Sequence, residues 1–159
     1  MPPDSALREQ LQQLVEGGNA HTDFDDAVQG MPLDLVGIRP SGSPHSAWEL
    51  LEHIRLAQKD ILGFSRSAEW VSPQWPEGYW PASPRPEKPE QWMHSVESYR
   101  RDRAEFLALV QDPGQDLTKP FPWGEGQTLL REALLIADHA AYHLGQLVLV
   151  RRLLGAWRK

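Results

Sequence analysis

Apolar side chains recur at helical spacing along most of this chain, with polar side chains between them. The pattern predicts four long helices, over residues 5–16, 44–68, 90–110 and 129–154, and a short helical turn capped by Thr22. Ser46 and Glu49 form the S-x-x-E pattern of a capping box just ahead of the second long helix. Glycines close the first and last helices, and Thr128 is the expected N-cap of the last one.

The segments between the helices are long and rich in proline, glycine and aromatic residues. Residues 69–89 and 111–127 hold too many prolines for a helix, and their tryptophans argue against disorder. We expect ordered loops whose rings pack on the helices. Because no convincing strand pattern is present, the sequence predicts an all-α, up-down four-helix bundle with long Pro/Trp-rich loops, in a single domain over residues 1–159.

Composition narrows the possible functions. The net charge is −6 and no dense Lys/Arg cluster stands apart from acidic neighbours, which argues against binding to nucleic acid. The chain has no cysteine, so disulfides, a cysteine nucleophile and thiolate ligands are excluded. Without a secretory pattern near the first residues or an apolar run long enough for a membrane span, we expect a cytoplasmic protein.

Two histidines stand on one face of the last helix. His139 and His143 are four residues apart, so they differ by only about 40° around the helix axis and their rings can reach one ion. The same face carries large apolar residues and should point inward. Two buried neutral imidazoles can also satisfy each other, or a carbonyl, by hydrogen bonding, and the pair alone does not decide between these alternatives.

His53 strengthens the metal interpretation, because it lies on the inward face of the second long helix. Two facing helices can bring three imidazoles to one interior point, as metal sites in helical bundles commonly do. Three neutral imidazoles leave a coordination position open, which is typical of catalytic sites and suits Zn, Ni, Fe or Mn. His21, His45 and His94 are interpreted as surface or capping residues.

Three segments of the chain together resemble the DinB-like superfamily, which includes YfiT-like relatives. The resemblance rests on "HSAWELLEHIRLAQKDILGF", "WPEGYWP" and the last helix with "DHAAYHLGQ", and it covers residues 30 to 157. It implies a divalent metal held by His53, His139 and His143, and a homodimer. Relatives of known activity are metal-dependent S-transferases that use bacillithiol, mycothiol or glutathione, and one is a mycothiol-dependent isomerase.

Two functional hypotheses follow. In the first, the protein is a metal-dependent enzyme, a thiol S-transferase or hydrolase acting on a small electrophile. Glu49, Asp60 and Glu132 would orient a histidine or act as base, and the aromatic loop, with Trp75, Tyr79 and Trp80, would wall the pocket.

In the second hypothesis, the protein is a non-catalytic metal-binding or stress-response bundle that acts through dimerisation. The last helix is apolar on nearly all sides, since Leu130, Leu134, Leu144 and Val148 lie opposite the histidines. A closed four-ligand shell would favour this hypothesis, and an open coordination position would favour the enzyme.

Overall fold

The computed structural model describes residues 4–157 and is built from helices. Their bounds are α1 Ser5–Glu16, α2 Phe24–Val28, α3 Ala47–Arg66, α4 Glu90–Gln111 and α5 Leu129–Leu153, with a 3-10 turn, η1, at Glu77–Tyr79. Over these residues the only β-type pairing is one isolated bridge between Pro120 and Thr128. The all-α prediction is confirmed, and the predicted long helices agree with the observed ones to within three residues at each end.

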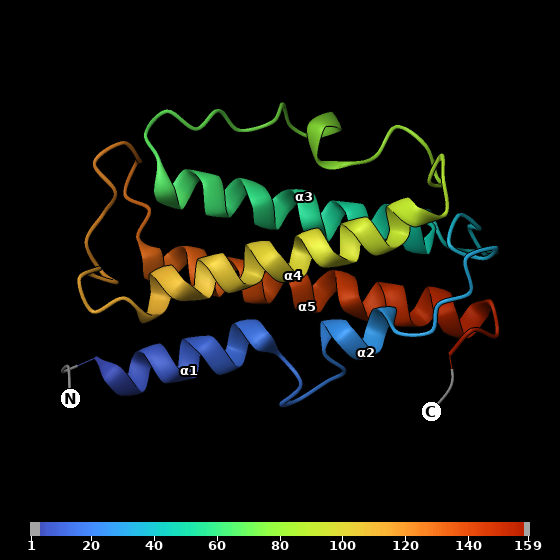
Figure 1. Cartoon of the computed structure of the whole chain (residues 1–159), viewed down its shortest axis with the longest axis horizontal. Coiled ribbons are helices and arrows are strands. Elements are labelled where there is room, and N and C mark those ends of the chain that lie inside the picture. Colours follow the sequence, from blue (N-terminus) through green and yellow to red (C-terminus); the bar gives the residue numbers. More distant parts are fainter. Residues whose placement is uncertain (1–3, 158–159) are drawn as a thin grey trace.

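The four long helices pack as a square in which α3 touches α4 and α5, and α1 touches the same two from the other side (Figure 1). Helices α3 and α4 run parallel, since Gln58 bonds to Tyr99 and, further along both helices, Arg66 pairs with Glu105. The bundle therefore departs from strict up-down alternation at this one connection. The reason is the proline-rich segment 67–89, which runs back along α3 before α4 begins.

Local capping determines where α3 and α5 begin. Ser46 accepts a hydrogen bond from the backbone of Glu49, and the Glu49 carboxylate accepts one from the backbone of Ser46, so the predicted capping box is confirmed. Thr128 caps α5 as predicted. The expected cap at Thr22 is wrong: Asp23, one residue later, accepts from the backbone of Asp26 and begins α2.

The apolar core has two parts, one at each end of the bundle. One part joins the first half of α3 to the second half of α5 and the start of α4, and the other joins the far ends of the same helices to α1. On α5, Ala137 belongs to one part and Ala140 to the other. The two residues between them include His139, so the histidines lie near the junction of the two clusters.

The face of α5 predicted to meet a partner is mostly covered by the bundle itself. Leu144 is buried, and Leu130 and Val148 pack against the core, which leaves only Leu134 of that set exposed. Helix α5 packs against both α1 and α3, and these two helices account for that cover. Large apolar side chains are instead exposed at Tyr142, Leu149 and Leu153.

Helix α5 is also long and apolar enough to cross a membrane by length and composition alone. Half of this apolar stretch is buried inside the bundle, and the core helix of a bundle can have the same length and composition.

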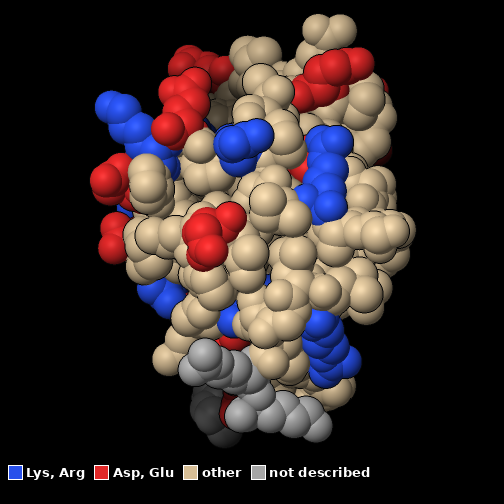
Figure 2. Space-filling view, turned by 90° about the vertical axis from the view of Figure 1, so that its right-hand side faces the viewer, with Lys and Arg blue, Asp and Glu red and all other residues tan. Residues whose placement is uncertain are grey.

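At the end of the bundle where α3 begins and α5 ends, acidic and basic side chains are scattered among broad uncharged areas (Figure 2). The described residues form no continuous basic surface at this end.

Candidate metal centre

The packing of α3 against α5 brings the three predicted histidines together. One ring nitrogen from each of His53, His139 and His143 lies within 4.8 Å of the others. The Nε2 atoms of His53 and His139 are 3.0 Å apart, and two nitrogens bound to one tetrahedral zinc ion lie about 3.3 Å apart. The cluster could hold a metal ion after small ring movements.

Hydrogen bonds on the outer side of two rings fix which nitrogen faces the cluster. Nδ1 of His53 is 2.8 Å from the backbone oxygen of Tyr79, and Nδ1 of His143 is 3.1 Å from the side-chain oxygen of Gln146. Because both oxygens accept, both Nδ1 atoms carry the proton and both Nε2 atoms present a lone pair. Metal-ligating histidines are usually oriented in this way.

An aromatic stack holds His53 from one side. The Trp80 ring lies parallel to the His53 ring, with centroids 3.9 Å apart, and the His45 ring stacks on Trp80 at 4.2 Å. His45 was predicted to be a surface or capping residue, and its place in this stack was missed. Nothing in the local sequence relates residue 45 to residue 80, because the contact depends on the path of the 67–89 loop.

Burial keeps all three imidazoles in the neutral form that a metal requires. Burial, with repulsion from His143 and His53, lowers the pKa of His139 from 6.5 to about 4. Burial likewise lowers the pKa of His143 to about 4, against the opposing effect of its bond to Gln146. The pKa of His53 is lowered by burial, although the Tyr79 carbonyl acts in the opposite direction.

Asp60 is connected to His53 through Tyr79. The Asp60 carboxylate accepts hydrogen bonds from the Trp70 indole and from the Tyr79 hydroxyl, both at 2.7 Å. The backbone oxygen of that same Tyr79 accepts from His53. Asp60 therefore holds the 67–89 loop on α3 at Tyr79, the residue that orients the His53 ring. Asp60 thus acts on His53 indirectly, whereas a general base would need direct contact with the reactant.

Glu49 and Glu132 have other partners. Burial acts to raise the pKa of Glu49, but hydrogen bonds from Arg39 and Ser46 lower it overall, and they occupy both carboxylate oxygens. Glu132 is buried, which raises its pKa, and it pairs with Arg131. It lies seven residues before His139, about 10 Å along the helix. Over residues 4–157 neither carboxylate joins the three imidazoles.

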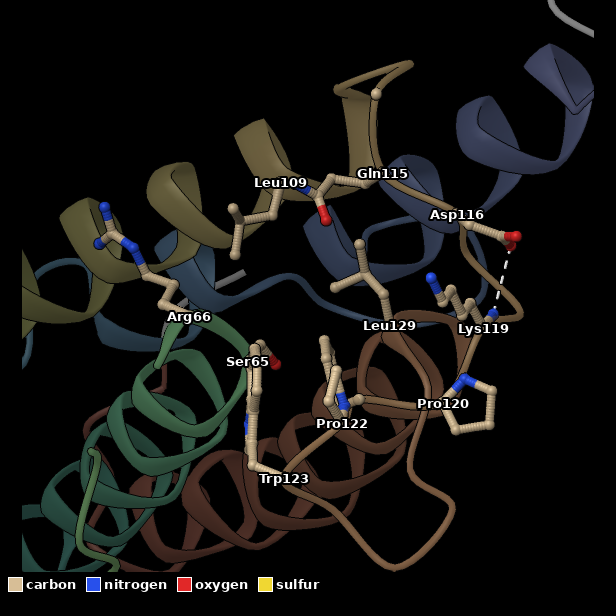
Figure 3. Close-up of a pocket in the computed structure, with 12 residues that line it drawn as sticks. Ser65, Arg66, Leu109, Gln115, Asp116, Lys119, Pro120, Pro122, Trp123 and Leu129 are labelled. Carbon is tan, nitrogen blue, oxygen red and sulfur yellow. Dashed lines mark hydrogen bonds between the residues drawn. The ribbon is translucent and has the colours of Figure 1, made fainter. Parts of the chain in front are cut away.

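Two cavities differ in their relation to the cluster. One, of about 370 Å³, is lined by His143 itself. A larger one, of about 550 Å³, lies at the opposite end of the bundle among Arg66, Lys119 and Trp123 (Figure 3). Thirteen residues of α3 separate Arg66 from His53, about 20 Å along the helix, so the larger cavity cannot serve chemistry at the histidines.

The pattern of residues 18–147 matches the family model described as the DinB superfamily. No curated protein and no solved structure matches the chain. The match spans most of the chain, including α3, the aromatic loop and the part of α5 that carries His139 and His143.

The depressed pKa values predict how acid affects the metal-free protein. Between pH 6.5 and 4 the unfolded chain binds protons at His139 and His143 that the folded chain does not. The free energy of unfolding should therefore fall as the pH falls through this window. Urea unfolding in chelator at pH 7, 6 and 5 measures it, and His143→Gln should reduce the pH dependence.

His94→Gln is the matched control, because His94 is an exposed histidine on α4. The same pH dependence in wild type and His143→Gln would contradict the burial of an uncharged imidazole at this position.

Proposed function

Because this chain belongs to the DinB superfamily, we propose that it is a metal-dependent enzyme in which His53, His139 and His143 hold one divalent ion, Zn, Ni, Fe or Mn. One observation carries the proposal: three neutral imidazoles converge with no fourth His, Asp or Glu beside them among the described residues. A closed four-ligand shell would suit a structural site, whereas three ligands leave a position for a reactant.

The proposed reaction is the transfer of a low-molecular-weight thiol to a small electrophile. The thiol sulfur forms a bond to an electrophilic carbon, the leaving group departs with the electron pair of the broken bond, and the thiol proton is released to water. A divalent ion held here would lower the pKa of a thiol or water beside it. Hydrolysis, with water as nucleophile, is the same proposal with a different reactant.

The protein's own residues have positioning roles in this scheme. Tyr79 and Gln146 hold the Nδ1 protons of His53 and His143, so that both Nε2 atoms face the ion. Asp60 holds Tyr79 in place. Neither Glu49 nor Glu132 is assigned as base, because their carboxylates are engaged by Arg39 and Arg131.

A non-catalytic bundle acting through dimerisation is the second candidate. The large apolar side chains exposed on α5, Tyr142, Leu149 and Leu153, are the observation that favours it. The homodimer itself, the absence of nucleic-acid and membrane partners and the cytoplasmic location stay predictions.

Metal content is the first test. Protein purified without an affinity tag should carry close to one equivalent of a transition metal per chain, and His143→Ala should lose it, because two imidazoles are left in an open site. Elemental analysis of the two proteins measures this. His94→Ala should retain the metal, and full retention of metal in His143→Ala would refute the assignment of the ligands.

Removal of Asp60 tests the route through Tyr79. Asp60→Ala should weaken metal binding by about tenfold, at the lower end of the effect of losing an outer hydrogen-bond partner, with little change in helix content. Competition with a chromophoric chelator gives the affinity. The control is Asp138→Ala, because Asp138 is exposed and adjacent to His139 in sequence. Equal metal affinities in the two variants would contradict the proposed role of Asp60.

A thiol-transfer screen tests the reaction. The metal-loaded protein is assayed with bacillithiol, mycothiol or glutathione and a panel of electrophiles, and conjugates are measured by mass spectrometry. We expect one thiol to give a rate at least about tenfold above both the metal-free protein and His143→Ala, since thiol activation depends on the ion. Metal binding without any conjugate or hydrolysis product would favour the non-catalytic candidate.

A further inference from the structure

The cavity beside His143 has the position and size of a substrate site. Its volume of about 370 Å³ falls within the range of small-molecule pockets. One side is the turn of residues 42–45 and the other is the second half of α5. The lining is formed by Gly42, Ser43, Pro44, His45, Leu50, Tyr142, His143, Gln146, Leu149, Val150 and Leu153.

Among the described residues, the walls of this cavity carry no formally charged side chain. Most of its surface is apolar, and Leu50, Leu149, Val150 and Leu153 are among its lining residues. Within residues 4–157, no Lys, Arg, Asp or Glu is among its lining residues, in contrast to the cavity at the other end of the bundle, which has Arg66, Asp116 and Lys119. A charged group placed here would lose water without gaining an opposite charge from these side chains, which is costly.

His45 is one of the polar residues at this mainly apolar wall, together with Ser43, Tyr142, His143 and Gln146. Its ring is held by stacking on Trp80, whose other face covers His53. Within residues 4–157 no hydrogen bond engages the ring nitrogens of His45. By contrast, the hydroxyl of Ser43 is bonded to the His45 backbone and the Gln146 oxygen to His143. The His45 ring is therefore free to bind a polar atom of a ligand.

We propose that this cavity binds the electrophilic substrate, and that this substrate is an uncharged, mainly apolar molecule whose polar atom hydrogen-bonds to His45. Calling this ligand a substrate rests on the proposed function. The link is His143, which belongs both to the cavity and to the candidate metal centre. The inference goes beyond that function in assigning the chemical class of the second reactant and a residue that positions it.

Two fluorescent probes of nearly the same shape test the charge preference. N-phenyl-1-naphthylamine is neutral, and 8-anilinonaphthalene-1-sulfonate adds one sulfonate. In chelator, where no ion adds charge to the cavity, the neutral probe should bind saturably at one site per chain. The sulfonate should bind about tenfold more weakly or worse, since the described lining residues offer it no positive charge. Equal binding, or preference for the sulfonate, would overturn the proposal.

Variants locate the probe site. Leu149→Arg places a positive charge on the cavity wall and should weaken the neutral probe while strengthening the sulfonate, a reversal that simple misfolding would not produce. Leu134→Arg is the matched control, because Leu134 is an exposed leucine of α5 outside the cavity. His45→Phe keeps an aromatic ring on Trp80 but removes the ring nitrogens, and should weaken the neutral probe several-fold.

Light scattering on the same proteins tests whether a second copy of the chain occupies this surface instead of a small molecule. If Leu149→Arg converts a dimer to a monomer and leaves probe binding unchanged, a second copy of the chain covers this surface and the proposal fails. Probe binding requires neither metal nor turnover, so a positive probe result with no thiol-transfer activity would refute only the proposed reaction. Transfer activity without displacement of the probe by the electrophile would refute only this inference.

Discussion

The antiparallel packing of α3 on α5 is the contact on which the candidate centre depends. It places His53 opposite His139 and His143, and two helical turns away it places Asp60 and Glu132 around one small cavity. Apolar neighbours on both helices bury these groups, and burial keeps the imidazoles uncharged. The same buried face thus provides both the stability of the bundle and the chemistry of the site.

Helical periodicity accounts for what could be predicted from the sequence. The positions of His139 and His143 on one face, and of His53 on the inward face of another helix, follow from regular geometry and from the capping box that begins α3. The parallel course of α3 and α4 could not be predicted in this way, because a proline-rich segment specifies no direction. Glu49 was considered for the site because it is four residues from His53, yet its partner, Arg39, lies in the preceding loop.

Most of the contacts that were missed involve irregular backbone. Tyr79 was expected to contribute its aromatic ring to the pocket wall, but it contacts His53 through its carbonyl oxygen, which any residue possesses, so no side-chain pattern could predict this role. His45 gains its role from a ring 35 positions further along the chain. Gln146 was nearer to prediction, since it lies three residues after His143 on the same helical face, but only the bond to Nδ1 distinguishes it from an ordinary polar residue.

Because the 67–89 loop is attached beside the three histidines, docking of the loop on α3 and binding of an ion would favour each other. Tyr79 and Trp80 contact His53 only while the loop lies against α3, where Asp60 holds it through Tyr79 and Trp70. Any ion that prefers the oriented ring must favour the docked loop to the same extent, by thermodynamic linkage. If the proposed ion binds, a substitution that detached this loop from α3 would therefore weaken binding at a buried site that the substituted residue does not touch.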